Sequence, residues 1–255
     1  MNIQQIRNAT LVVAYAGKRF LIDPWLQKKG VGRSAPTPWK EKNKLPSPSV
    51  GLPMPVEQIV RGIDAIIVTH IHPDHFEQET AAILDKRIPV FTRDEKDAKT
   101  IREWGFETVR ALSPQGTAFG EATLVKTKGR HGTSSIKNAG PVCGVVFRAP
   151  REKTLYIAGD TVFYDEVAQE LDTHRPDVVV LNACAATLLF AGRLIMGKED
   201  VLAVCKAAPY ATVIASHMEA VNHATVSRAE LREYLTENGI GEQVLIPQDG
   251  ECCEF

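Results

Sequence analysis

Long apolar runs, an excess of one charge and paired cysteines are all missing from this chain of 255 residues. No stretch approaches the roughly 18 uninterrupted apolar residues that a membrane-spanning helix needs, so we expect no membrane insertion. The 30 Lys and Arg side chains nearly balance the 31 Asp and Glu side chains, whereas general nucleic-acid binders are usually strongly basic. The first residues lack a basic head followed by an apolar core, so we expect a cytoplasmic protein without a secretory signal.

The five cysteines show no paired spacing. An odd, unpaired set is not the pattern of a disulfide framework and suits a reducing compartment. Cys143 and Cys205 lie in apolar surroundings and are expected in the core. Cys184 follows an apolar run and could approach a metal site, although a buried, inert thiol is the more usual outcome. The adjacent Cys252 and Cys253 suit neither tetrahedral zinc nor an unstrained disulfide, and we assign them to a last strand.

Four strong metal ligands fall within six positions directly after the apolar run 65–68. The run is typical of a buried strand, and His70, His72, Asp74 and His75 follow it on the turn before a helix-compatible stretch. Open α/β folds place their sites at this carboxyl edge of a sheet. Imidazole is the commonest metal ligand, and a carboxylate adds hard-oxygen character. Chance would explain one or two such residues, but the whole run predicts a metal or catalytic site.

The pattern His-x-His-x-Asp-His resembles the signature of the metallo-β-lactamase superfamily, a large group of mostly metal-dependent hydrolases. In that family the motif is followed by a lone His, an Asp and a last His, each at a strand end. This sequence has His131, then Asp160 within Gly-Asp-Thr, then His217, each after a strand-like run. The resemblance therefore extends from about Ile3 to His217.

The resemblance implies two metal positions in one site, with three ligands for each ion and one shared between them. The first ion would be held by His70, His72 and His131, the second by Asp74, His75 and His217, and both by Asp160. Three protein ligands per ion leave an open position for water, and two ions about 3.5–4 Å apart can share one hydroxide. We expect two divalent ions, Zn²⁺ first, with Mn²⁺ and Fe²⁺ as alternatives.

The expected elements form two similar αβ halves. Strands are expected near residues 4–7, 10–15, 18–22, 64–69, 89–92, 117–119, 123–128, 143–148, 155–158, 178–181 and 211–216, and helices near 78–84, 94–104, 164–171, 199–207 and 228–237. Ser227 and Glu230 make a capping box at the start of the last helix. Together with the resemblance, this order predicts one α/β domain over residues 1–255 with the four-layer αβ/βα sandwich of the metallo-β-lactamase fold.

The segment from about 28 to 55, which we call the flap, interrupts this pattern. It carries six prolines and the six cations Lys28, Lys29, Arg33, Lys40, Lys42 and Lys44. A linker would need a domain on each side, and long irregular loops in compact domains are usually functional or disordered. We therefore expect a partly ordered flap at the mouth of the metal site, whose cations would suit an anionic substrate. A second candidate wall is 187–198, where Arg193 or Lys198 could bind a carboxylate or phosphate or equally face solvent.

Four further residues have both a functional and an ordinary interpretation. Asp23 could orient an imidazole ligand or only form an Asp-Pro turn. Thr69 could hydrogen-bond a ligand or be an ordinary strand residue, and His174 is interpreted as a solvated loop residue. His223 competes with His217 for the last ligand position, and His217 is favoured because it ends a strand. His223 is then a catalytic candidate, as a substrate contact or proton donor, or a surface histidine.

Within the superfamily, Asp23-Pro24-Trp25 and the compact chain look most like the branch of small hydrolases that includes L-ascorbate 6-phosphate lactonase. This resemblance implies hydrolysis of a small ester, lactone or phosphorylated metabolite by a metal-bound hydroxide. Asp74 would be the catalytic proton acceptor as well as a ligand, and the second metal would stabilise the oxyanion. We expect a small-molecule substrate, anionic in view of the flap, and no nucleic acid; the oligomeric state, including a homo-oligomer, is left open.

Three alternatives remain. A phosphodiesterase or nuclease of the same fold would use the same metals but normally brings extra domains or a basic arm. An iron-dependent oxygenase on this scaffold would hold a redox metal. A non-catalytic metal-binding protein is also open, because fold and ligands do not define a substrate.

Overall fold

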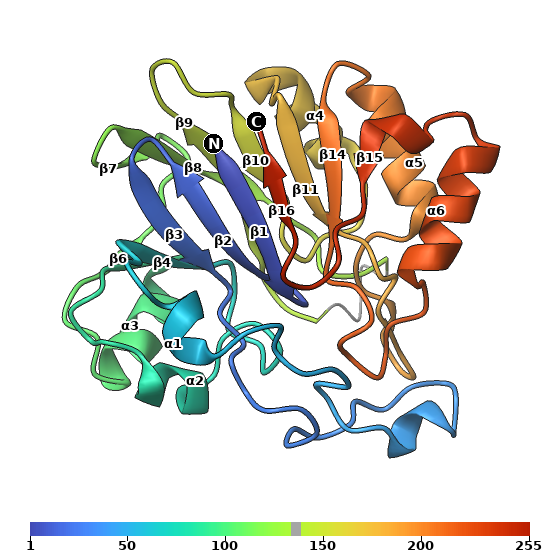
Figure 1. Cartoon of the computed structure of the whole chain (residues 1–255), viewed down its shortest axis with the longest axis horizontal. Helices are drawn as coiled ribbons and strands as arrows, with labels where there is room; N and C mark the ends of the chain where they lie inside the picture. Colours follow the sequence, from blue (N-terminus) through green and yellow to red (C-terminus); the bar gives the residue numbers. More distant parts are fainter. Residues whose placement is uncertain (134–138) are drawn as a thin grey trace.

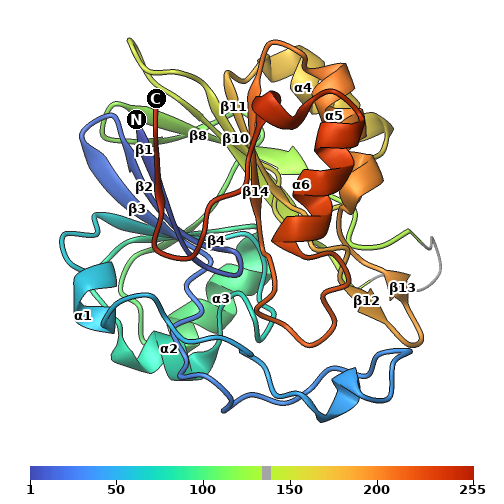
Figure 2. The same ribbon diagram turned by 45° about the vertical axis from the view of Figure 1, so that its right-hand side comes forward.

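The computed structural model describes residues 1–133 and 139–255 and contains two large sheets that face each other, with helices on both outer sides (Figures 1 and 2). The first sheet contains β1 (Asn2–Arg7), β2 (Thr10–Tyr15), β3 (Lys18–Ile22), β4 (Ala65–Val68), β5 (Val90–Thr92), β6 (Val109–Ala111) and β16 (Cys252–Glu254). The second contains β7 (Thr117–Phe119), β8 (Ala122–Lys128), β9 (Cys143–Arg148), β10 (Leu155–Ile157), β11 (Val178–Asn182), β14 (Thr212–Ser216) and β15 (Val244–Leu245). The four-layer sandwich expected from the sequence is confirmed.

Each sheet has an antiparallel and a parallel part. The first sheet runs β16-β1-β2-β3-β4-β5-β6 and is parallel from β3 to β6. The second runs β15-β14-β11-β10-β9-β8-β7 and is parallel from β10 to β15. Parallel strands place their carboxyl ends at the same edge of a sheet, so the loops after β4, β10, β11 and β14 collect where sites form in open αβ sheets.

Alternate residues along each strand enter different cores, because successive side chains point to opposite faces of a sheet. In β2, Val13 belongs to the core between the sheets, whereas Val12 faces the core under the helices of the first half. In β9, Phe147 enters the same central core, and Val146 enters the core under the helices of the second half. Three apolar layers therefore hold four layers of secondary structure together.

The helices are α1 (Val56–Ile59), α2 (Gln78–Ile83), α3 (Glu95–Glu103), α4 (Asp165–His174), α5 (Lys198–Ala207) and α6 (Arg228–Glu237). Two of the helices, α3 and α6, begin at caps that the sequence predicts. The Asp94 side chain accepts a hydrogen bond from the backbone N of Asp97 at 3.0 Å and caps α3, and Ser227 and Glu230 form the predicted capping box of α6. These caps satisfy backbone N–H groups that have no partner inside the helix.

His174 is one correction to the sequence-based interpretation. It ends α4 instead of lying in a solvated loop, and its side chain is 11% exposed. Its Nε2 lies 3.0 Å from the Glu170 carboxylate, four residues earlier on the same helix face. The sequence signal was masked because the following Arg175-Pro176 looks like loop, whereas Arg175 only closes the helix with a φ of 43°.

The flap follows β3 and has little regular structure: the short 3-10 turn η1 (Lys42–Lys44) and an isolated bridge between Gly32 and Ser47. It runs along the lower edge of the molecule in Figure 1 and meets the small hairpin β12 (Thr187–Leu188) and β13 (Gly192–Arg193) through a hydrogen bond from the Leu189 N to the Pro36 O at 2.9 Å. Within residues 1–133 and 139–255, none of the helices combines the length and apolar character of a membrane span.

Candidate metal centre

The seven predicted ligands come together at the shared carboxyl edge of the two sheets. Four of them, His70, His72, Asp74 and His75, lie on the loop between β4 and α2 in the first sheet. The remaining three follow strands of the second sheet and are His131 after β8, Asp160 after β10 and His217 directly after β14. We call these seven residues the ligand cluster. Since both sheets contribute, the cluster exists only when the two halves pack together.

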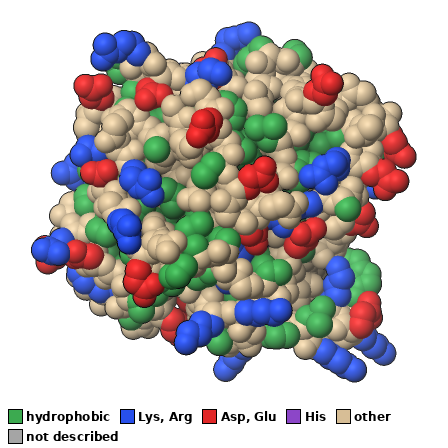
Figure 3. Space-filling model, viewed as in Figure 1, with side chains coloured by type: hydrophobic (Ala, Val, Ile, Leu, Met, Phe, Trp, Pro, Cys, Tyr) green, Lys and Arg blue, Asp and Glu red, His purple; other side chains and the backbone are tan. Residues whose placement is uncertain are grey.

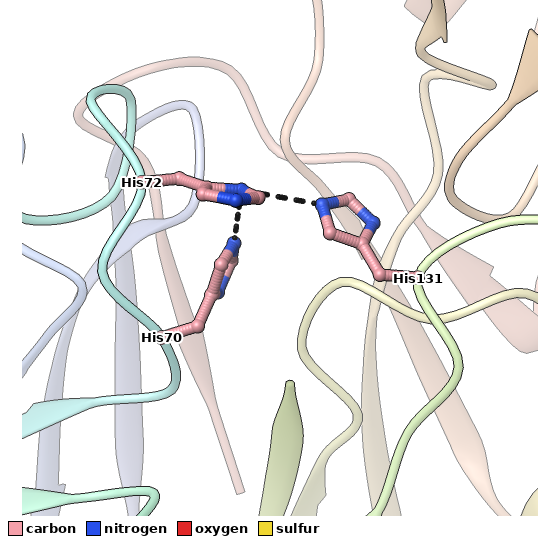
Figure 4. A group of neighbouring side chains, drawn as sticks. All are labelled: His70, His72 and His131. Atoms are coloured by element: carbon pink, nitrogen blue, oxygen red, sulfur yellow. Dashed lines mark hydrogen bonds between the residues drawn. The ribbon is translucent and has the colours of Figure 1, made fainter. Parts of the chain in front are cut away.

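Three of the imidazoles turn their nitrogens toward one point (Figure 4). His72 Nδ1 lies 2.9 Å from His70 Nε2 and 3.3 Å from His131 Nε2. His72 therefore faces the point through Nδ1, and its two neighbours face it through Nε2. A cation with three nitrogen ligands and an open fourth position is the usual arrangement of catalytic zinc.

A second group forms beside the first. Asp74 Oδ2 lies 3.3 Å from His217 Nε2 and 4.0 Å from His75 Nε2. Both imidazoles are fully buried. His75 Nε2 lies 3.2 Å from Asp160 Oδ2, but it makes no well-aligned hydrogen bond within the part of the chain that the structure describes. A buried ring nitrogen without a partner is costly, and a metal ion in this group would satisfy it.

Asp160 lies between the two groups. Its Oδ2 is 3.2 Å from His75 Nε2 and 3.5 Å from His131 Nε2, while its Oδ1 is 3.8 Å from His217 Nε2. The Asn182 amide donates a 2.6 Å hydrogen bond to Oδ1 and fixes the carboxylate. One carboxylate thus reaches ligands of both groups, which is the geometry that a bridging role requires.

Buried partners set the tautomer of the ligand imidazoles. The Thr69 hydroxyl donates its hydrogen to Asp23 at 2.6 Å. Toward His70 Nδ1, 3.1 Å away, the same hydroxyl can only accept, so His70 carries its proton on Nδ1. Asp23 also accepts from His75 Nδ1 at 2.9 Å, and the Leu194 carbonyl accepts from His131 Nδ1 at 3.2 Å. With the proton on Nδ1, each of these rings turns the lone pair of Nε2 toward the cluster. The donor set therefore fits divalent cations.

For Asp23 and Thr69, the structure favours the functional interpretation, because both side chains hydrogen-bond histidines of the ligand cluster. Asp23 is 1% exposed and also accepts from the Thr69 backbone N at 2.7 Å. Cys184 is buried too, and its Sγ lies 3.5 Å from His217 Nδ1, on the side of the ring away from the cluster. Cys184 contacts His217 on the side of the ring opposite the cluster, and it belongs to none of the groups of possible metal ligands among the described residues.

Charges in the cluster are closely balanced. Burial lowers the pKa of His70 and His131, which favours the neutral rings that bind metals. Burial acts on His75 in the same direction, but the carboxylates of Asp160, Asp23 and Asp74 outweigh it and raise the pKa of His75 to about 10. In the ion-free protein a proton on His75 therefore partly neutralises these carboxylates, and a bound cation would take over that role.

A pocket of about 570 Å³ opens beside the cluster. Its walls include His72, Asp74, His131 and Asp160 from the cluster, and His223 from the loop after β14. The apolar side chains that line it are Trp25, Val31, Ala35, Pro73, Ala139, Ala186, Leu188, Leu194 and Val221. The ring of His223 lines the pocket, and its Nδ1 is buried without a hydrogen-bond partner among the described residues.

The flap forms part of this pocket, but most of its cations do not. Among the described lining residues, Arg33 is the only Lys or Arg. Lys42 instead donates to the Ala224 carbonyl at 2.6 Å. In the second candidate wall, Arg193 pairs with Asp200, and the Lys198 ammonium lies 4.9 Å from the centre of the Tyr234 ring.

Two asparagines of the site, Asn8 and Asn182, were not predicted from the sequence. Asn8 donates to the Asp74 carbonyl at 2.9 Å and lies 3.2 Å from His217 Nε2, and Asn182 holds Asp160. Asn182 could have been found, because it ends the buried strand β11 at the same carboxyl edge as the ligands. Asn8 lies on a turn with a positive φ of 55°, a conformation that asparagine tolerates well. Nothing in its sequence context points to the site.

Comparison with known proteins places the chain in a family. The family model described as "Beta-lactamase superfamily domain" matches residues 18–218. The chain belongs to the metallo-β-lactamase superfamily. Within it, the chain belongs to the UPF0173 family of metal-dependent hydrolases: it is 48% identical to the UPF0173 protein YddR of Bacillus subtilis over 257 residues, covering 100% of both chains.

Two solved structures are similar over nearly their whole length. An isothiocyanate hydrolase from Delia radicum gut bacteria is 44% identical with a TM-score of 0.93, covering 100% of this chain and 99% of that one. A possible metal-dependent hydrolase from Veillonella parvula is 32% identical with a TM-score of 0.93, covering 99% and 98%. The predicted superfamily and fold are thereby confirmed, and the more detailed likeness to the lactonase branch stays a prediction.

Proposed function

We propose that the chain is a binuclear metal hydrolase whose substrates are isothiocyanates, small uncharged molecules R–N=C=S with an electrophilic central carbon. The observation that carries the proposal is the pocket beside the ligand cluster. Apolar side chains make up much of its wall, and polar groups come from the cluster, from the flap and from Glu77 and Glu79. An apolar R group suits those walls, because binding pockets are usually apolar with a few placed polar groups. The similarity to an isothiocyanate hydrolase at 44% identity supports the same substrate class.

In this proposal His70, His72 and His131 would hold one ion, Asp74, His75 and His217 would hold the other, and Asp160 would be shared between them. When bound, divalent ions of this kind lower the pKa of water and polarise the atom that is attacked. We propose Zn²⁺ in both positions. The protein residues orient the ligands, exclude bulk water and move protons.

The proposed reaction adds one water to the central carbon and then breaks the bond from that carbon to nitrogen: R–N=C=S + H₂O gives R–NH₂ and O=C=S. Both protons of the water end on the amine nitrogen. Asp74 is the proposed acceptor of the first proton; burial would raise its pKa, but His75 and His217 hold it well below its usual value, so Asp74 is ionised at neutral pH. His223, which lines the pocket, is proposed to carry a proton to the leaving nitrogen.

A small ester or lactone is the second candidate substrate, because its carbonyl carbon can be attacked from the same position. Arg33 on the pocket wall favours substrates of this kind that carry a carboxylate or phosphate. Figure 3 shows further Lys and Arg side chains along the lower edge of the molecule, where the flap lies.

The test is a substrate panel on protein purified without added metal, after its metal content has been measured. We expect two ions per chain and release of amine and carbonyl sulfide from neutral isothiocyanates, faster than from esters, lactones or phosphate esters. Chelation should abolish the activity and added metal should restore it. Full metal content without isothiocyanate hydrolysis would overturn the substrate proposal, and full activity after proven metal loss would overturn the mechanism.

The role of His223 has its own test. His223→Ala should keep both ions and lower kcat by about 10²–10⁴-fold, the usual range for a proton-transfer residue. His174→Ala is the matched control, because His174 lies at the end of α4, outside the site. Unchanged kcat in His223→Ala would remove His223 from the mechanism.

A further inference from the structure

One buried amide of the scaffold contacts the flap at several points. Asn222 lies on the loop between β14 and α6, next to His223, and is 4% exposed. Its side chain points away from its own loop and contacts the flap at Ala35, Lys42 and Ser47. These three residues are spread over thirteen positions of the flap sequence, so a single side chain ties together segments that have almost no regular structure of their own.

All the hydrogen-bonding capacity of the Asn222 amide is used on the flap. Its Oδ1 accepts from the Ala35 N at 2.9 Å and from the Ser47 hydroxyl at 3.3 Å. Its Nδ2 donates to the Ala35 carbonyl at 2.8 Å and to the Lys42 carbonyl at 3.2 Å. The paired bonds to Ala35 resemble those between neighbouring strands. An amide has two donors and two acceptor sites, and no other side chain type could make this set without loss.

The same bonds close the wall of the substrate pocket. Val221, Asn222 and His223 line the pocket on one side of the junction, and Ala35 and Ser47 line it on the other. The loop side is itself fixed, since the His223 carbonyl accepts from the Thr187 N of β12 at 2.9 Å. The flap therefore contacts a rigid surface through Asn222, directly beside a proposed proton-carrying residue.

We propose that Asn222 is a positioning residue that sets substrate selectivity: its amide holds the middle of the flap in place as a pocket wall. This inference rests on the proposed function only in that the pocket is taken to bind the substrate. Without the amide, the flap would spend part of its time displaced from its position in the pocket wall. The apparent affinity for substrate would then equal the affinity of the complete pocket multiplied by the fraction of time that the wall is in place. The chemistry of a bound substrate would be unchanged, because Asn222 belongs to none of the described ligand groups.

The ends of the flap have separate attachments. Arg7 donates to the carbonyls of Trp25, Gln27 and Val50. Ser49 bonds to Ala220 and Glu219 at 2.8 Å and 2.7 Å. In the middle of the flap, the hydrogen bonds from the Leu189 N to the Pro36 O and from Lys42 to the Ala224 carbonyl do not involve the Asn222 amide and would remain. Loss of the amide would therefore loosen the middle of the flap and leave its ends in place, so the fold should survive the change.

The first measurement needs no substrate. The flap carries the trypsin sites Lys28, Lys29, Arg33, Lys40, Lys42 and Lys44. In Asn222→Ala we expect cleavage at Arg33, Lys40 or Lys44 to become about tenfold faster, because cleavage follows the population of the open form. Asn238→Ala is the matched control: Asn238 is an exposed asparagine at the end of α6. Ser47→Ala removes one partner from the flap side and should give a smaller increase.

The second measurement separates positioning from general structure. With a neutral isothiocyanate, Asn222→Ala should raise KM by about tenfold, leave kcat within about twofold, and keep the wild-type metal content. Asn222→Asp keeps the acceptor oxygen but loses the donor to Ala35 and Lys42, and it should fall between wild type and Asn222→Ala. For larger substrates the rise in KM should be smaller, because a pocket with a displaced wall has room for them.

Each outcome decides for or against the proposal. Faster flap cleavage with a raised KM supports it. Wild-type cleavage and an unchanged KM would overturn it, and so would equal effects in Asn238→Ala or a loss of kcat with metal loss, which marks a merely structural role. If the wild type hydrolyses no isothiocyanate, the proposed function fails, while the trypsin result still decides whether Asn222 holds the flap.

Discussion

The ligand cluster and the flap are built in opposite ways. Every ligand of the cluster follows a strand of one of the two sheets, directly or within a short loop, and most of the imidazoles are held from behind by a buried group such as Asp23 or the Leu194 carbonyl. The flap has one 3-10 turn and one isolated bridge, and it is held mainly by side chains of the scaffold, Arg7 and Asn222. The first region derives its order from the fold, and the second from a few polar contacts.

This difference separates two functions that meet in one pocket. The sheets fix the metal chemistry, because moving a ligand would require moving a strand in a close-packed core. The flap can change in length and sequence with little cost to the core, since loops tolerate such changes. Selectivity can therefore vary among relatives while the ligands stay in place.

The largest expected effect is on the cluster. Among the residues that the structure describes, Asp160 is the carboxylate that lies near ligands of both groups, His131 in the first and His75 in the second, and Asp160→Ala removes it. Mutating a residue that only hydrogen-bonds a ligand typically lowers metal affinity or activity 10–100-fold. Losing a ligand itself should therefore lower turnover by more than about 100-fold and release metal from both positions. Metal analysis after dialysis measures this directly, with Asp172→Ala on the exposed face of α4 as control. Retention of two ions would show that Asp160 does not bridge.

The next prediction concerns Asp23, which hydrogen-bonds His75, and it tests whether such residues contribute to metal binding. In the wild type, the Thr69 hydroxyl and His75 Nδ1 both donate to a carboxylate oxygen of Asp23. The amide of Asp23→Asn has only one oxygen to accept hydrogen bonds, so His75 loses its fixed orientation. Metal affinity should fall about 10–100-fold. Asp64→Asn is the control, because Asp64 lies at the other end of β4 and binds Lys18 at 3.0 Å. Equal losses in both variants would contradict the assignment of Asp23.

The comparison also separates what the sequence could predict from what it could not. The convergence of the seven cluster residues was predictable because each follows an apolar run, and apolar runs define strands whatever surrounds them; their role as metal ligands stays a prediction. The choice of His217 over His223 rested on the same argument, and the structure places His217 within a ligand group and His223 in the pocket wall. Local patterns also located the helix caps at Asp94 and Ser227.

Long charged side chains and short elements were not predictable in this way. The flap lysines and Arg193 looked like substrate contacts, but the direction of such a chain depends on tertiary neighbours: Arg193 pairs with Asp200. The strands β6 and β15 and the helix α1 are only a few residues long and show no periodicity of their own. The anchor Asn222 carries no local signal either, because its partners lie about 180 residues away in the sequence.

A third prediction tests whether the flap depends on polar contacts alone. Arg7 is fully buried; it donates to the Trp25 carbonyl at 2.7 Å, Gln27 at 3.0 Å and Val50 at 3.2 Å. Arg7→Met keeps most of the volume but leaves these carbonyls without their donor. The free energy of unfolding should fall by about 3 kcal/mol, measured by urea denaturation. The exposed Arg87→Met, which loses only its pair with Asp85, should change it by less than about 0.5 kcal/mol.

The smallest expected effect concerns a histidine outside both regions. Burial, and then the neighbouring Arg148, lower the pKa of His174 in the folded protein, so the unfolded chain binds a proton more tightly. Stability from this group is therefore complete above the unfolded value of about 6.5 and is lost as the pH falls through the lower folded value. His174→Asn removes this contribution, so its melting temperature should fall less than that of the wild type between pH 7.5 and 5.5, by no more than about 3 °C. A ring titration of His174 by NMR provides the direct check. A midpoint at or above about 6.5 would contradict the sign, and a difference in melting temperature much larger than about 3 °C would contradict the small contribution assigned to this histidine.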